Sequence, residues 1–346
     1  MGHCDSKIAN AICGEVLPGY ELSAAQCKTH MVRGRKIVIK AMEKMTIRRL
    51  KRIGHKENPL HELSIMQMMG SDAPHVSGLI DAVEDVTTVY SIMLDLGTEL
   101  FNFAGKMSEN KIRHCFLQIV KGVQTMQRFS LCHRDISLEN ILVSESGICT
   151  IIDFGLTLVV PRMQQFQVNS VLSSQWPGGD NGGGEEVTDD EDSSADLSAL
   201  AEQMDDDEAD SDNNSGANQN NFEREYIPVM LLPQGNCGKE NYVAPEIMAN
   251  KNPFDAMVVD NWALGVLLFM LFTGRPPFIR ACTSDQYYRS VQKHSLKDIM
   301  MSWDMAANVS PEAIDLLERM LKSSNPRNRL TCEDILSHRW MTQTVE

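Results

Sequence analysis

Long hydrophobic runs are missing from the sequence. The most apolar segment, Trp262 to Phe272, reads WALGVLLFMLF. A helix needs about 20 apolar residues to cross a bilayer, so this run predicts a buried core helix instead. The N-terminus has no charged segment followed by an apolar one, and no segment repeats along the chain. We therefore expect neither a secretory signal nor a solenoid.

Closely spaced cysteine pairs are also missing. The nine cysteines are scattered, and none occurs in a C-x-x-C pattern. This usage argues against a zinc site and against a disulfide framework, and it fits a reducing compartment. We therefore expect a cytoplasmic protein. With 346 residues, 42% of them hydrophobic and 23% charged, the chain has an ordinary globular composition and is long enough for two lobes.

Basic residues are lacking from one long stretch. Between Asp180 and Asp212 there are 15 of the 47 acidic residues and no Lys or Arg. Outside this stretch the acidic residues equal the 32 Lys and Arg in number, so the net charge of −15 arises here. The stretch is rich in Gly, Ser and Asn, and too poor in aromatics to offset its ordering entropy by burial. We predict a disordered acidic insertion at about residues 160–230, and no nucleic-acid partner.

The flanking segments show two kinds of pattern. Residues 36–42 (KIVIKAM) alternate as a strand does. Asn58 and Pro59 provide a cap and a first-turn proline for a helix that runs through Met69. After Gly238 the periodicity is almost entirely helical. A strand-rich first part and a helical remainder predict an α+β fold with two lobes and a cleft between them.

A short hairpin is predicted at residues 140–152. Two arms of nearly equal length flank the turn SESG at residues 144–147, so Asn140 and Asp153 should lie at the same open end. Two oxygen ligands there could share magnesium ions that are bound to phosphates. Asp135, on the preceding loop, is close enough to act on a hydroxyl presented to such a phosphate. This arrangement indicates phosphoryl transfer.

Several motifs follow one another in an order that is specific as a set. They are Ile37-Val-Ile-Lys40, Glu62, His133-Arg-Asp135, Asn140, Asp153-Phe-Gly155, Ala244-Pro-Glu246, Asp260-x-Trp262-x-x-Gly265 and Arg329. With them the chain resembles eukaryotic-type protein kinases from about Val16 to Trp340. The resemblance implies a small strand-rich N-lobe at 16–96 after a tail at 1–15, and a larger helical C-lobe at 97–341 that the acidic insertion interrupts.

The resemblance also assigns roles to the matching positions. Lys40 would hold the α- and β-phosphates of ATP and pair with Glu62. Asn140 and Asp153 would bind Mg²⁺, and Asp135 would orient the substrate hydroxyl or accept its proton. The cofactors implied are therefore ATP and Mg²⁺.

The segment YSIMLDLGTEL at residues 90–100 resembles the hinge that follows the last strand of the N-lobe. Met93 would be the gatekeeper, and Leu94 and Asp95 would follow it beside the nucleotide. Glu99 stands where many kinases bind an Arg of the substrate, which implies protein substrates with Arg or Lys near the phosphorylated residue.

Three departures from the family pattern bear on activity. The region around Gly14 and Gly19 contains no G-x-G-x-x-G, although backbone amides that approach phosphate closely favour glycine. Ser137 replaces the Lys that usually touches the transferred phosphate. Lys239 replaces a Thr, and in the family's fold positions 137 and 239 are neighbours. We predict a swap in which Lys239 supplies the ammonium and Ser137 the hydroxyl. The alternative is that Lys239 is a surface residue of a loop.

Two functional hypotheses remain open. The first is a serine/threonine kinase, because the segment from Tyr242 to Glu246 resembles that class and the A-A-R-N of tyrosine kinases is missing. The C-terminal part resembles the calcium/calmodulin-dependent group. The second is a pseudokinase scaffold with weak or no catalysis, to which the missing glycines and Ser137 point. The complete set of catalytic residues weighs against the scaffold.

The acidic insertion and the N-terminus carry further motifs. Thr188 and Ser193 precede acidic residues, as in sites of acid-directed kinases. The insertion is either a spacer or an autoinhibitory segment. The N-terminal MGHCDS matches an N-myristoylation motif at Gly2, with Cys4 available for a second acyl chain. Membrane association is expected only through such acylation, since one myristoyl chain binds marginally.

Overall fold

The structure is a computed structural model that describes most of the predicted domain. The residues described are 26–32, 35–56, 59–70, 73–160, 230–232, 235, 237–305, 309–322 and 325–343. The predictions for Gly14, Gly19, the acidic insertion and the N-terminal motif lie outside these residues.

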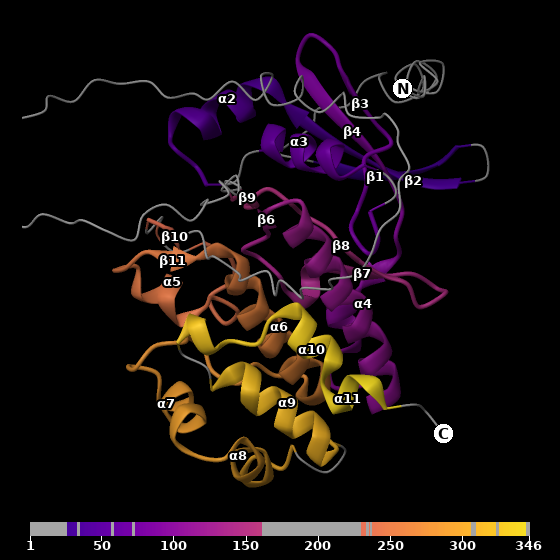
Figure 1. Ribbon diagram of the computed structural model, residues 1–346. Coiled ribbons are helices and arrows are strands. Elements are labelled where there is room, and N and C mark those ends of the chain that lie inside the picture. The colour runs from indigo at the N-terminus through magenta and orange to yellow at the C-terminus, as the bar shows by residue number, and fades with distance from the viewer. Residues whose placement is uncertain are drawn as a thin grey trace, which may run out of the picture. The chain divides into compact units, whose positions relative to one another are not determined.

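An antiparallel sheet forms the N-terminal part (Figure 1). Its strands run in the order β1 (Gln26–Val32), β2 (Arg35–Glu43), β4 (Thr88–Leu94) and β3 (Asp81–Glu84). Strand β2 contains the predicted alternating segment, and its residues Ile37 and Ile39 pack with Tyr90 and Ile92 in a buried cluster. Lys40 pairs with Ser91 of β4 in the register of the sheet.

Two helices accompany this sheet. Helix α2 (Lys44–Arg52) follows β2 directly, and helix α3 (Pro59–Met69) is the helix predicted from its first-turn proline. Ile65, Met66 and Met69 of α3 belong to the largest buried cluster among the described residues. Figure 1 shows α2 at the margin of this region, next to α3. Helix α3 is therefore fixed by its buried face, while α2 remains open to solvent.

The remainder is mainly helical, which confirms the predicted α+β class. Its helices are η1 (Leu100–Phe103), α4 (Glu109–Arg128), η2 (Leu138–Asn140), α5 (Pro245–Ala249), α6 (Ala256–Thr273), α7 (Gln286–Lys293), α8 (Leu296–Ser302), α9 (Pro311–Leu321), η4 (Pro326–Asn328), α10 (Cys332–Ser337) and α11 (Arg339–Thr342). Its short strands are β5 (Thr98–Glu99), β6 (Leu131–Cys132), β7 (Ile141–Val143), β8 (Cys149–Ile151), β9 (Leu158–Val159), β10 (Met230–Leu231) and β11 (Phe254–Asp255).

Helix α6 contains the most apolar run of the sequence. Among the described residues it is the one helix long and apolar enough to span a membrane, yet 83% of it is buried inside the protein. The side chain of Asp255 caps its N-terminus by accepting a hydrogen bond from Met257 N, and Gly274 ends it with a φ of 71°. The prediction of a buried core helix is thus confirmed.

Glu246 and Arg329 form a buried ion pair between α5 and the loop before α10. The Arg329 Nη1 and Nη2 atoms lie 2.6 and 2.9 Å from the two carboxylate oxygens of Glu246. The side chain of Arg329 is 1% exposed and that of Glu246 is 13% exposed. Arg329 Nη1 also donates to Val258 O at 3.0 Å. This bidentate geometry ties the chain after the active-site region to the core of the helical part.

The Glu246→Ala variant is expected to lose about 3–5 kcal/mol of unfolding free energy, because it leaves a buried guanidinium without its counter-charge. Urea denaturation followed by tryptophan fluorescence measures this loss. The double variant Glu246→Met, Arg329→Met removes both charges and should lose less unfolding free energy than Glu246→Ala. A double variant that is less stable than Glu246→Ala would contradict the ion-pair explanation.

Candidate active site

The predicted hairpin brings Asn140 and Asp153 to one end. In the antiparallel pairing of β7 with β8, Ile141 lies opposite Ile151, and Ile152 N donates to Asn140 O at 3.0 Å just beyond this pair. The two arms are therefore in register up to the open end, as equal arm lengths require. The chain then turns at Asp153, the residue directly after this bond.

Asp153 adopts an unusual backbone conformation. Its φ is 68°, in the left-handed region that Asp enters more readily than most residues. The next residue, Phe154, is fully buried and contacts the ring of His133, with 5.5 Å between the ring centroids. The side chain of Asp153 is left exposed. Burial of Phe154 thus fixes the turn that presents the Asp153 carboxylate to solvent.

Asp135 and Asn140 are hydrogen-bonded to each other. Asn140 Nδ2 donates to Asp135 Oδ2 at 2.7 Å and to Asp135 O at 2.9 Å. Because the amide nitrogen is engaged in this way, the amide oxygen of Asn140 is the atom available to a cation. The side chain of Asp135 is 12% exposed, so it is reachable from solvent but held in place.

Lys239 reaches the same carboxylate from a distant segment. Its backbone N donates to Asp135 Oδ1 at 3.0 Å, and its Nζ lies 3.0 Å from Asp135 Oδ2 and 3.0 Å from Ser137 Oγ. Ser137 itself is fully buried. The ammonium and the hydroxyl therefore meet beside Asp135, which is the geometry that the predicted swap requires. The catalytic roles of Lys239 and Ser137 stay a prediction.

A glycine makes this approach of Lys239 sterically accessible. Gly238 has a φ of 83°, and a Cβ at this position would lie 2.5 Å from Arg134 O. A larger residue would both strain the backbone and collide with the catalytic loop. Gly238 thus allows the loop that carries Lys239 to lie directly against the loop that carries Asp135.

Lys40 and Glu62 form the ion pair expected from the resemblance. Lys40 Nζ lies 2.6 Å from Glu62 Oε2, and the side chains are 23% and 9% exposed. The neighbouring His61 was not predicted: its Nε2 lies 2.8 Å from Thr157 O, in the segment after Asp153. Helix α3 is therefore bonded both to the strand with Lys40 and to the segment that follows the turn at Asp153.

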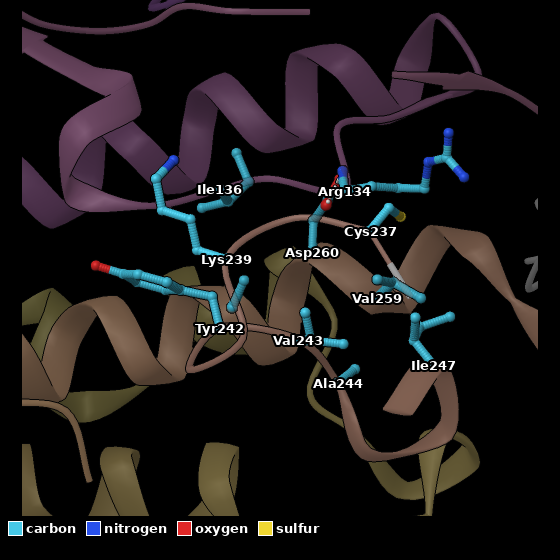
Figure 2. A pocket seen from close by; sticks show the side chains of 11 residues that line it. Arg134, Ile136, Cys237, Lys239, Tyr242, Val243, Ala244, Ile247, Val259 and Asp260 are labelled. Atoms are coloured by element: carbon cyan, nitrogen blue, oxygen red, sulfur yellow. Dashed lines mark hydrogen bonds between the residues drawn. The ribbon is translucent and has the colours of Figure 1, made fainter. Parts of the chain in front are cut away.

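The loop that carries His133, Arg134 and Asp135 is anchored to helix α6 through Asp260, a contact that motif order alone did not indicate. Asp260 Oδ2 accepts from His133 N at 2.7 Å, and Oδ1 accepts from Arg134 N at 2.9 Å. Burial raises the pKa of the Asp260 carboxyl, while His133 and these two N–H donors act against that rise. Figure 2 shows Asp260 close to Arg134 in the pocket that Lys239 also lines.

His133 has a structural role in the same loop. Its Nδ1 accepts from Asp135 N at 3.2 Å, so its Nε2 carries the proton and donates to Ile152 O at 3.0 Å. Tyr242 supports the loop from the other side, because its hydroxyl accepts from Leu138 N at 3.2 Å. Burial raises the pKa of the Tyr242 phenol, which therefore stays protonated at neutral pH. These buried contacts fix the position of Asp135.

The predicted hinge residues lie at the end of β4 and just after it. Met93 is partly buried and packs against the main core, whereas Leu94 is 42% exposed. The carboxylate of Asp95 lies 2.7 Å from Lys36 Nζ, and this hydrogen bond lowers the pKa of Asp95. Glu99 is exposed. Contact of these residues with nucleotide or substrate stays a prediction.

The site accommodates magnesium by the chemistry of its donor atoms. Mg²⁺ prefers oxygen ligands and takes most of them from water and substrate phosphates, so one or two protein groups suffice. The exposed carboxylate of Asp153 and the amide oxygen of Asn140 are such groups, and they lie at one end of the hairpin. Among the described residues, no cluster of three or more His, Cys, Asp or Glu offers an alternative metal site.

Comparison with known proteins agrees with this geometry. The family model of the protein kinase domain matches residues 22–177 and 219–341. The chain therefore belongs to the protein kinase domain family.

Curated relatives match nearly the whole chain. It is 27% identical over 320 residues to CBL-interacting serine/threonine-protein kinase 15 of Arabidopsis thaliana, which covers 92% of this chain and 57% of the relative. It is 24% identical to the carbon catabolite-derepressing protein kinase of Candida tropicalis, over 91% of this chain and 38% of that protein. It is also 24% identical to the human SNF-related serine/threonine-protein kinase, over 97% of this chain and 34% of that protein. The chain thus spans less than two thirds of the length of these relatives.

Proposed function

We propose that the chain transfers the γ-phosphoryl group of ATP to Ser or Thr hydroxyls of protein substrates. The observation that carries this proposal is the convergence of Asp135, Asn140 and Lys239 from two distant segments, next to the turn at Asp153. The names of two relatives, which are serine/threonine-protein kinases, support the choice of acceptor.

Each residue of the site has a role in this reaction. Lys40, held by Glu62, binds the phosphates of ATP and orients them. Asp135 binds the substrate hydroxyl and accepts its proton. Asn140 and Asp153 would hold Mg²⁺, which supplies positive charge to the phosphates when it is bound. Lys239 adds a further cation at the acceptor side, where negative charge develops on the transferred group.

The substrate class follows from an exposed acidic side chain. Glu99 is exposed on β5 and lies opposite Leu142 of β7, the strand that begins directly after Asn140. We propose that it selects substrates with Arg or Lys close to the phosphorylated residue. We also propose a cytoplasmic location, from the cysteine usage.

A direct assay tests the proposed activity. The purified full chain, supplied with radiolabelled ATP and Mg²⁺, should phosphorylate a peptide that has one Ser flanked by Arg. Transfer should stop when EDTA removes the metal. Lys40→Met should lose transfer, because no cation then orients the phosphates. Lys121→Met, an exposed lysine on α4, is the matched control and should keep full activity.

The pseudokinase hypothesis predicts a different outcome in the same samples. The chain would show a magnesium-dependent increase of its melting temperature with ATP, but no transfer to any Ser or Thr peptide. That combination would contradict the proposed activity. The complete set of Lys40, Glu62, Asp135, Asn140 and Asp153 favours the enzyme.

A further inference from the structure

Helix α2 combines one buried position with a strongly cationic surface. Ile47 packs with Met42 and Val89 in a small cluster that attaches the helix to the sheet. The nine residues of the helix, KMTIRRLKR, include five Lys or Arg and no Asp or Glu. The kinase reaction proposed above uses none of them.

Three arginines share the outward face of this helix. Met45, Arg48, Arg49 and Arg52 follow the spacing i, i+3, i+4 and i+7, which places them on one side of a helix. All four are exposed, and so is the adjacent Lys51. Within the part of the chain that the structure describes, no ion pair or hydrogen bond involves the side chains of Arg48, Arg49 and Arg52. Their charges are therefore available to an external anion.

Lys44 behaves differently from these arginines. Its Nζ lies 3.0 Å from Glu84 Oε2 and donates to Asp85 O at 2.5 Å. The ammonium is thus used to hold the start of α2 against the turn between β3 and β4. The free cations begin one turn later, at Arg48.

Large apolar side chains stand among the free cations. Met45 is 78% exposed and Ile53, directly after the helix, is 63% exposed. Val86 is 93% exposed on the turn between β3 and β4, and the bond from Lys44 N to Thr87 O at 2.8 Å places this turn next to the start of α2. We call this set the α2 surface: Met45, Arg48, Arg49, Lys51, Arg52, Ile53 and Val86.

The combination of charges and apolar groups identifies the partner. Phosphate-bearing lipid headgroups attract Lys and Arg, and the boundary with the acyl chains accepts apolar side chains from the same helix. An acidic peptide would match the arginines but would leave Met45, Ile53 and Val86 in water. We propose that the α2 surface binds anionic lipid membranes, a route independent of the acylation at Gly2 and Cys4 through which alone the sequence predicted membrane association. The arginines contact the headgroups, and the three apolar side chains enter the interface.

The range of this attraction is short. The acidic excess of the chain arises between Asp180 and Asp212, and the remainder is electrically balanced. Membrane attraction therefore comes from the local α2 surface and not from the net charge. Charges that are separated by more than about 10 Å are screened at 0.1 M salt, so binding must fall steeply as the salt concentration rises.

Vesicle co-sedimentation of the full, unacylated chain tests the proposal. Vesicles of phosphatidylcholine mixed with phosphatidylserine should bind the chain, and vesicles of phosphatidylcholine alone should not. Each cation near an anionic surface increases partitioning about fivefold, so Arg49→Gln with Arg52→Gln should weaken binding roughly 25-fold. Phosphotransfer to peptide in solution should remain unchanged in this variant, which shows that the protein is folded.

Matched variants separate the membrane from other partners. Arg319→Gln with Arg327→Gln removes the same charge from exposed positions on α9 and η4, and should bind vesicles like the wild type. Arg49→Lys with Arg52→Lys should also bind, because a lipid surface responds to charge and not to the guanidinium fork. Met45→Ser with Ile53→Ser should weaken binding while leaving its salt dependence intact.

Three results would overturn the proposal. The first is equal binding to vesicles with and without phosphatidylserine. The second is an equal loss of vesicle binding in the double variant at Arg319 and Arg327, which would indicate that net charge alone governs binding. The third is binding of a soluble peptide with the sequence from Asp180 to Asp212, lost on Arg-to-Lys exchange in α2, with no vesicle binding. That result would identify an acidic protein segment as the partner.

Discussion

The Asp135→Asn variant is expected to transfer phosphate at least about 10³-fold more slowly than the wild type, because it removes the group that accepts the hydroxyl proton. Both oxygens of Asp135 accept hydrogen bonds: Oδ2 from Asn140 Nδ2 and Lys239 Nζ, and Oδ1 from Lys239 N. An asparagine amide has only one accepting atom, so its nitrogen would face one of these donors. The variant therefore loses both the base and its alignment.

Single-turnover transfer to peptide at saturating Mg²⁺ and ATP measures this loss. Asp298→Asn provides the control, because Asp298 is exposed on α8 and lies outside the site. The melting temperature with ATP should still rise for Asp135→Asn, since the phosphate-binding residues remain. A variant that keeps more than a tenth of the wild-type rate would show that Asp135 is not the base.

The second large effect is expected at Lys239. Lys239→Thr should lower kcat by about 10²–10³-fold, because it removes a cation that is placed where negative charge develops in the transition state. The KM for ATP should change little, since Lys40 holds the other phosphates. Initial rates over a matrix of ATP and peptide concentrations separate these two parameters.

Restoring the lysine at the other position should restore the rate. In the double variant Lys239→Thr, Ser137→Lys, the threonine vacates the space beside Asp135 that the Lys239 ammonium occupies, 3.0 Å from Ser137 Oγ. A lysine that extends from position 137 can fill that space. Ser137→Lys alone should be poorly folded, because position 137 is fully buried and the second cation would meet the first. Full activity of Lys239→Thr would refute the swap.

Local sequence patterns were sufficient for the elements that position the site. The alternation at 36–42 predicted β2, and the equal arms around the SESG turn predicted that Asn140 and Asp153 would meet. Both features depend on short-range geometry, which a sequence expresses directly. The pairing of Lys40 with Glu62 came instead from family resemblance, since no local rule connects a strand with a helix 22 residues later.

Local sequence patterns did not predict the contacts between distant segments. Asp260 bonds to the catalytic loop across 127 residues, and His61 bonds to Thr157 across 96. The periodicity of α6 shows only that Asp260 is a polar residue in an apolar helix. No local pattern predicts its hydrogen-bond partners. The sheet order β1-β2-β4-β3 was likewise not predicted, because strand alternation carries no information about neighbours.

Lys239 was intermediate between these cases. Its departure from the family pattern, together with that of Ser137, predicted an exchange from the sequence alone. The structure brings the two side chains together, with Lys239 Nζ 3.0 Å from Ser137 Oγ. A double departure at neighbouring positions is therefore a more useful signal than either substitution by itself.

Under the proposed function, the position of Lys239 also determines how completely phosphoryl transfer can be stopped. In a kinase whose cation lies on the same loop as the base, displacing the segment that here carries Lys239 leaves the charge in place and permits some residual turnover. Here that displacement withdraws the ammonium and the backbone N–H from Asp135 in one movement. With that segment displaced, phosphoryl transfer should consequently be very slow. The ratio of the transfer rate with the segment in place to the rate with it displaced should therefore be large.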